Sequence, residues 1–222
     1  MTLTGALMSC TVLGLQHGVD WDHVAAISDV TSVQRTTREA TLCGLHYAIG
    51  HAATVGLLGI AVIALRQSLP ETLSVWMQRF VGVTLILLGA YVFHALFSGR
   101  QPLSRGQAIL EIFGRLHRGD PKRDCGRKSS LSLGILHGLG AETPTQLSML
   151  VIAASLGGLQ DGILALTVFA TGMFVSNMVL TTAATSVFAI SKLRPALFRW
   201  LGAFTAGYSL WIGIVLLTSS GS

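Results

Sequence analysis

The chain has 222 residues, of which 51% are hydrophobic and only 11% are charged. About a quarter of the residues in soluble domains are charged, so this composition excludes an ordinary soluble domain and indicates a helical membrane protein. The formal net charge of +5 does not predict nucleic-acid binding, because the basic residues cluster between apolar runs, where membrane topology accounts for them. Three cysteines, an odd number, predict no disulfide framework.

Six apolar runs predict six transmembrane helices, because each is near or above the roughly 20 residues that a helix needs to cross a bilayer. The first run lacks the basic start of a cleavable signal peptide and is predicted to be the first span. The connection 98–129 is basic, and its stretch "AILEIFGRLHRG" predicts a short helix lying on the membrane surface. The six predicted helices cover residues 3–27, 40–65, 73–97, 130–157, 161–190 and 197–218.

The basic residues also predict an orientation. Thirteen of the 15 Lys and Arg residues follow the first, third or fifth predicted helix, and only Arg66 and Arg79 fall toward the other side. Because loops rich in Lys and Arg stay in the cytoplasm, these connections are predicted to be cytoplasmic and both termini to lie outside. The predicted location is the plasma (inner) membrane.

An internal repeat relates the two halves of the chain. The stretch "LGLQHGVDWD" (13–22) matches "LGILHGLGAE" (133–142) at a constant offset of 120 residues. Three predicted helices separate the copies, so the two copies would cross the membrane in opposite directions, as in many transporters. Two pairs of polar residues coincide: His17 with His137, and Asp22 with Glu142.

The predicted fold is therefore an all-α membrane protein with six transmembrane helices arranged as two inverted three-helix repeats. The first repeat covers residues 1–97 and the second covers residues 130–222. The basic cytoplasmic loop 98–129 joins them.

The first predicted helix concentrates His17, Asp20, Asp22 and His23 within seven residues. An ionisable group at the bilayer centre costs about 2.5–3.5 kcal/mol, so some favourable interaction must offset this cost. On an ideal helix Asp20 shares a face with both histidines and Asp22 points away, unless the backbone is distorted near Gly18. Imidazole with carboxylate suits a divalent transition metal; a proton relay or a buried polar network is the alternative.

Further donors lie on the other predicted helices. In "GAETPTQ" (140–146) Pro144 predicts a break in its helix, lined by oxygen atoms that could pass a cation. The predicted metal ligands are His17, Asp20, Asp22, His23, His51, His137 and Glu142. The residues predicted to line the path or to support the ligands are His46, Thr143, Thr145, Gln146, Met173 and Asn177.

Four motifs resemble those of the nickel/cobalt transporter family. "HGVDWDH" fits its H-x4-D-H signature, "IGHA" its L-G-H-S motif, "LGAETPTQ" its L-G-F-D-T-A-T-E motif and "TGMFVSN" its G-M-x-x-x-D segment. Gln146 and Asn177 stand where the family has carboxylates, and the family commonly has eight spans rather than six. The resemblance implies uptake of Ni²⁺ or Co²⁺ as the transported substrate, without ATP hydrolysis and without a prosthetic group.

The predicted function is a secondary transporter that moves a divalent transition-metal cation by alternating access, and not an enzyme. The chain has no G-x-x-x-x-G-K-[ST] phosphate loop, and its His-Gly pattern occurs in both halves. The alternatives are a cation exporter of the same superfamily, an intramembrane zinc hydrolase and an amino-acid or anion exporter. The predicted partners are a divalent metal ion and the lipid bilayer; no oligomeric state is predicted.

Overall fold

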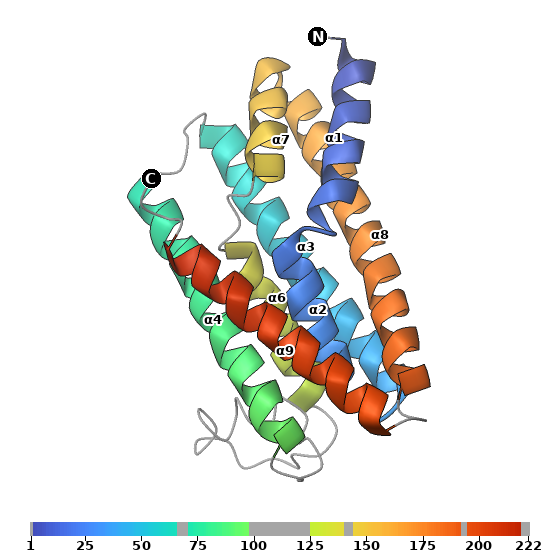
Figure 1. The fold of residues 1–222 in the computed structure, drawn as a ribbon. Coiled ribbons are helices and arrows are strands. Elements are labelled where there is room, and N and C mark those ends of the chain that lie inside the picture. The colour runs from blue at the N-terminus through green and yellow to red at the C-terminus, as the bar shows by residue number, and fades with distance from the viewer. Residues whose placement is uncertain (1, 66–70, 98–124, 140–143, 192–194, 219–222) are drawn as a thin grey trace.

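The computed structural model describes residues 2–65, 71–97, 125–139, 144–191 and 195–218, which pack as a bundle of helices (Figure 1). This bundle confirms the predicted all-α class. The described helices are α1 (Leu3–His17), α2 (Trp21–Ser32), α3 (Thr37–Leu65), α4 (Glu71–Phe97), α6 (Cys125–Leu139), α7 (Pro144–Ser155), α8 (Leu159–Ser191) and α9 (Pro195–Thr218).

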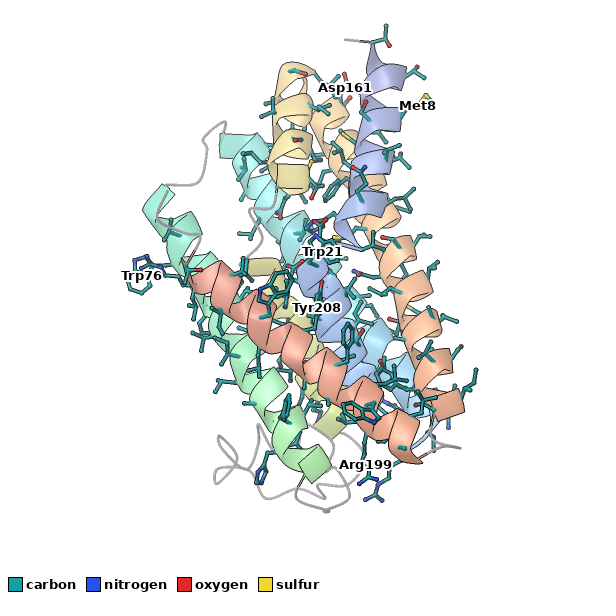
Figure 2. The ribbon with its side chains drawn as sticks, viewed as in Figure 1. Met8, Trp21, Trp76, Asp161, Arg199 and Tyr208 are labelled. Atoms are coloured by element: carbon teal, nitrogen blue, oxygen red, sulfur yellow. The ribbon has the colours of Figure 1, made fainter. Side chains whose placement is uncertain are left out.

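The surface and composition of the helices are those of a membrane protein. Three helical segments, Thr37–Ala64, Leu159–Ser191 and Ala196–Thr218, are long and apolar enough to cross a membrane. Two shorter apolar segments are Arg79–His94 and Thr145–Ser155. Large apolar side chains also point outward along the bundle (Figure 2), which suits a lipid environment better than water. Strongly exposed examples are Met8, Trp21, Leu57, Trp76, Trp200 and Phe204.

Two of the predicted helices are broken in the middle. The predicted helix 3–27 is two helices, α1 and α2, and the predicted helix 130–157 is α6 followed by α7. Helix α6 begins at Cys125, five residues inside the predicted loop 98–129. The predicted surface helix of that loop lies outside the described residues. In Figure 1 α1 and α2 run from the top of the view to the bottom, whereas α6 and α7 run from the bottom to the top.

Glycines allow each broken segment to approach a long helix closely. Gly14 of α1 lies against the backbone carbonyl of Phe169 on α8, with no room for a Cβ atom. Gly134 of α6 lies in the same way against the carbonyl of Tyr47 on α3. Small residues at a crossing let two backbones pack tightly, which stabilises helix pairs in lipid. The half-helices that carry His17 and His137 are therefore fixed by direct backbone packing.

A methyl group at Gly14 should destabilise the protein. Gly14→Ala places a Cβ atom against the Phe169 carbonyl, and such overpacking costs about 1–3 kcal/mol, which exceeds the helix propensity gained. Gly56→Ala is the matched control, because a Cβ atom at Gly56 of α3 meets nothing within 4 Å. Thermal unfolding in detergent should show a lower Tm for Gly14→Ala and an unchanged or slightly higher Tm for Gly56→Ala. Equal Tm values would contradict the close crossing.

Candidate metal centre

The break between α1 and α2 places polar side chains inside the bundle. Helix α1 ends at His17, and Gly18 follows as its C-cap, where Met173 and Ser176 of α8 leave no room for a side chain. Helix α2 begins after Asp20, its N-cap residue, whose carboxylate makes no capping hydrogen bond. A capping side chain would contribute about 1 kcal/mol to the stability of the helix. Because the Asp20 carboxylate does not cap α2, it is available for contacts within the site.

Three buried imidazoles converge beside this break. His17, His23 and His51 are each fully buried, and one donor atom from each lies within 4.8 Å of the others. The Nε2 atom of His51 lies 3.3 Å from Nε2 of His17 and 3.0 Å from Nε2 of His23. Two nitrogens bound to one ion by bonds of roughly 2.1 Å lie about 3.0–3.4 Å apart. The distances from His51 to the other two nitrogens are therefore those expected between ligands of a single metal ion.

Carboxylates contact two of these rings at Nδ1, the ring nitrogen that is not part of the trio. Nδ1 of His17 lies 3.2 Å from Oδ2 of Asp20, and Nδ1 of His23 lies 3.1 Å from Oδ1 of Asp22. The Thr145 hydroxyl joins the first pair, 3.1 Å from His17 Nδ1, and donates to Asp20 at 3.2 Å. A carboxylate on Nδ1 fixes the tautomer whose Nε2 lone pair can bind a metal. The sequence left open which aspartate faces the histidines; in the structure Asp20 contacts His17, and the break after His17 turns Asp22 toward His23.

Asp22 also links the two halves of the chain. Its Oδ2 atom lies 3.2 Å from Nε2 of His137, a buried residue of α6. The Nδ1 atoms of His51 and His137 have no hydrogen-bond partner among the described residues. The ring centroid of His137 lies 5.6 Å from that of His23 and 6.2 Å from that of His51. The carboxylate of Asp22 thus contacts a histidine of α2 and a histidine of α6.

The charge of the centre suits a divalent cation. The carboxylates of Asp20 and Asp22 contact histidines, and in the described part of the chain neither pairs with Lys or Arg. With neutral imidazoles, the described residues of the centre therefore carry a formal charge of −2, which one divalent ion would neutralise. The C-terminal ends of α1 and α6 also meet here, at His17 and His137. Their backbone carbonyls carry partial negative charge, whereas the N-termini of α2 and α7, which begin after the same breaks, carry partial positive charge.

The remaining predicted site residues are placed differently. His46 is turned away from the trio, with Nδ1 lying 2.7 Å from the backbone oxygen of Leu42. Gln146 is buried at the start of α7, beside Thr145. Met173 belongs to the apolar core and Asn177 is fully buried on α8. Glu142 and Thr143 lie outside the described residues.

Sequence reasoning missed two aromatic rings that line the centre. Tyr47 is fully buried, with its ring centroid 6.1 Å from that of His51 and 5.8 Å from that of His137. Phe169 packs against His17 at 5.5 Å. Tyr47 precedes His51 by four residues, so helical spacing already placed both on one face. These rings restrict water around the imidazoles.

Replacing His51 should abolish tight metal binding. Its Nε2 atom lies nearest to both other nitrogens, and a direct ligand should contribute at least the roughly 10- to 100-fold in affinity that a supporting residue contributes. Cobalt(II) titration of purified protein, followed by visible absorption, measures the loss in His51→Ala. His46→Ala on the same helix is the matched control and should bind normally. Equal loss in both variants would contradict the assignment of the trio.

Asp22→Asn should weaken metal binding without removing a residue of the trio. The amide keeps the size of the carboxylate but presents an N–H group to one of its two histidine partners, so one ring loses its acceptor. We expect roughly 10- to 100-fold lower affinity in nickel titration calorimetry. Asp161→Asn, at the far end of α8 (Figure 2), should leave the affinity unchanged. Wild-type affinity in Asp22→Asn would exclude this supporting role.

The chain is similar to several nickel transporters and nickel-related proteins. The urease accessory protein UreH of Bacillus sp. is 25% identical over 82% of this chain and 77% of its own length. The hydrogenase nickel incorporation protein HupN of Bradyrhizobium diazoefficiens is 28% identical over 92% of this chain and 60% of its own length. The nickel transporter NixA of Staphylococcus aureus is 30% identical over 72% of this chain and 55% of its own length. No solved structure matches the chain significantly.

These relatives confirm the resemblance to nickel/cobalt transporters at about 25–30% identity over most of the chain. The chain spans only slightly more than half the length of HupN and NixA. Residues 23–211 match the family model described as the cytochrome c biogenesis protein transmembrane region. The match covers most of the chain and includes His23, His51 and His137. The chain therefore belongs to this family of transmembrane regions, with nickel and cobalt transporters among its relatives.

Proposed function

We propose that this chain is a secondary transporter that carries a divalent transition-metal cation, Ni²⁺ or Co²⁺, into the cell. The observation that carries the proposal is the buried trio of Nε2 atoms of His17, His23 and His51, two of them backed by carboxylates. A soft Cu⁺ ion would prefer thiolates, and both cysteines described as free, Cys10 and Cys43, lie outside this trio. The names of HupN and NixA support nickel as cargo.

The proposed architecture is a pair of inverted halves around the metal centre. His17 packs on Phe169 with ring centroids 5.5 Å apart. In the matching position His137 packs on Tyr47 at 5.8 Å. An offset of 120 residues relates the two histidines, and one of 122 relates Tyr47 to Phe169. Each half thus contributes one imidazole to the centre. Each half also contributes one aromatic ring, which packs on the imidazole of the other half.

The crossing of α3 and α8 supports the same relation. Gly44 of α3 lies against Thr181 of α8, and Gly59 of α3 lies against the Leu166 side chain of α8. Adding 122 to the number of Gly44 gives Leu166, and subtracting 122 from that of Thr181 gives Gly59. The offset therefore converts the first contact into the second. A two-fold relation between the halves accounts for this correspondence, residue by residue.

The crossing of α4 and α9 repeats the pattern. Gly82 of α4 lies against Gly213 of α9, and Gly89 of α4 lies against Ala206 of α9. Adding 124 to the number of Gly82 gives Ala206, and subtracting 124 from that of Gly213 gives Gly89, so this offset converts one contact into the other. The offset grows by two residues at each successive helix of a half, which supports equivalent helices joined by slightly longer connections in the second half. We therefore infer six passes, with α1/α2 and α6/α7 as broken spans.

Alternating access follows from this architecture. Broken helices at the bilayer midplane supply ligands, and one half can rock against the other around them. Arg199 marks one end of the bundle, opposite Met8 and Asp161 (Figure 2), and we assign the Arg199 end to the cytoplasm by the positive-inside rule. An inside-negative potential of about 100 mV favours inward movement by about 2.3 kcal/mol per charge. Uptake of a divalent ion then needs no ATP.

Radioactive nickel uptake into proteoliposomes tests the proposal. Wild-type protein should accumulate ⁶³Ni²⁺ when a potassium diffusion potential makes the lumen negative, and Co²⁺ should compete. His17→Ala should lower the initial rate by roughly 10- to 100-fold or more, because it removes one of the three nitrogens. His46→Ala should transport normally.

Two outcomes would contradict the proposal. If His17→Ala takes up nickel at the wild-type rate, the trio is not the transport site. If wild-type vesicles accumulate no nickel at a negative potential but release preloaded nickel against it, the direction is efflux.

A further inference from the structure

A row of buried polar side chains on α8 is not used by the histidine centre. Asn177, Thr181 and Thr185 follow one another at intervals of four residues and are almost completely buried. The amide atoms of Asn177 and the hydroxyls of both threonines have no hydrogen-bond partner among the described residues. Burying an unpaired polar group costs free energy. The row therefore requires an explanation beyond packing.

The other hydroxyls of the same helix provide an internal contrast. Thr182 and Ser186 are exposed, and each donates to the backbone carbonyl four residues earlier at 2.8 Å. This is the usual way in which a membrane helix satisfies a hydroxyl group. Thr181 and Thr185 occupy the same turns of α8 without making this bond. Both side chains are buried inside the bundle instead.

Across the seam between α3 and α8 from Thr181 lies a row of small residues on α3. Gly44 lies against the side chain of Thr181, and helical spacing places Ala40 and Ala48 on the same face of α3. Both alanines are buried. These three residues of α3 offer no polar side chain to α8, and neither threonine hydroxyl has a hydrogen-bond partner among the described residues.

The pseudo-equivalent contacts, at the other end of the α3–α8 crossing, are apolar. There Gly59 packs against Leu166, and Gly162 packs against the side chain of Ile63. The same crossing of helices is thus built without polar groups on one side of the histidine trio. The polar row is therefore not a requirement of the crossing. The offset of 122 pairs Asn177 with Val55, Thr181 with Gly59 and Thr185 with Ile63.

We propose that Thr181 and Thr185 form a transit site through which a hydrated divalent cation passes between the histidine trio and the end of the bundle at the C-terminus of α8. The proposal rests on the transport function inferred above. Neutral oxygens suit transit, because they replace part of the hydration shell of an ion without holding it as imidazole does. The carbonyls at the C-terminus of α8 also favour a cation at that end of the bundle. In this structure the seam is closed.

A double replacement of Thr181 and Thr185 by Val separates transit from binding. Valine keeps the shape of threonine and removes the hydroxyl, so folding and the histidine trio should be preserved. We expect the initial ⁶³Ni²⁺ uptake rate of proteoliposomes to fall by roughly tenfold or more, with nickel affinity in detergent within about twofold of wild type. The double change to Ser keeps both hydroxyls and should restore the rate.

The exposed neighbours serve as the matched control. Replacing Thr182 with Val and Ser186 with Ala removes two hydroxyls from the same turns and should leave uptake unchanged. Wild-type uptake in the Thr181→Val, Thr185→Val protein would overturn the transit site, as would equal loss in both double variants. A drop in nickel affinity matching the drop in rate would also overturn it, because the row would then support the trio. Failure of wild-type protein to transport nickel would instead refute the proposed function.

Discussion

The structure is organised by the need to keep two carboxylates inside an apolar bundle. Asp20 and Asp22 have side chains that are 29% and 13% exposed, and their described partners are imidazoles and a hydroxyl rather than Lys or Arg. An isolated carboxylate in such surroundings is costly. Contact with Nδ1 of His17 and His23 offsets this cost and leaves both Nε2 atoms facing inward. One set of contacts thus stabilises the acids and prepares the donors.

That arrangement is possible only because the first span is interrupted. On a continuous helix Asp22 would point away from His23, and the N-cap position of Asp20 would not exist. The interruption in turn requires Gly18, since α8 lies directly against it. The close packing of Gly14 on α8 then holds the short helix α1 in place. Local backbone disruption at the centre is therefore balanced by close helix packing immediately beside it.

The sequence predicted the helical class, the long helices and the convergence of His17, His23 and His51. These succeeded because apolar length and polar clustering in lipid are strong signals. It left open which of Asp20 and Asp22 faces the histidines, because ideal helical angles do not apply across a break. It also missed Tyr47, which reads as one more apolar residue of its span. The repeat related His137 to His17, but the sequence did not predict that His137 contacts Asp22. Contacts between distant helices follow from packing and not from local pattern.

The charge of the centre determines where the membrane potential would act in the proposed cycle. With neutral imidazoles the two described carboxylates contribute a charge of −2 to the empty centre, and a bound divalent ion would neutralise that charge. A neutral centre changes its exposure without electrical work, whereas an inside-negative potential drives the empty, negative centre outward. At about 100 mV the two charges correspond to about 4.6 kcal/mol per cycle. The potential would thus act on the return of the empty transporter, and the absence of a fixed Lys or Arg partner for Asp20 and Asp22 in the described part of the chain is what makes that step electrically driven.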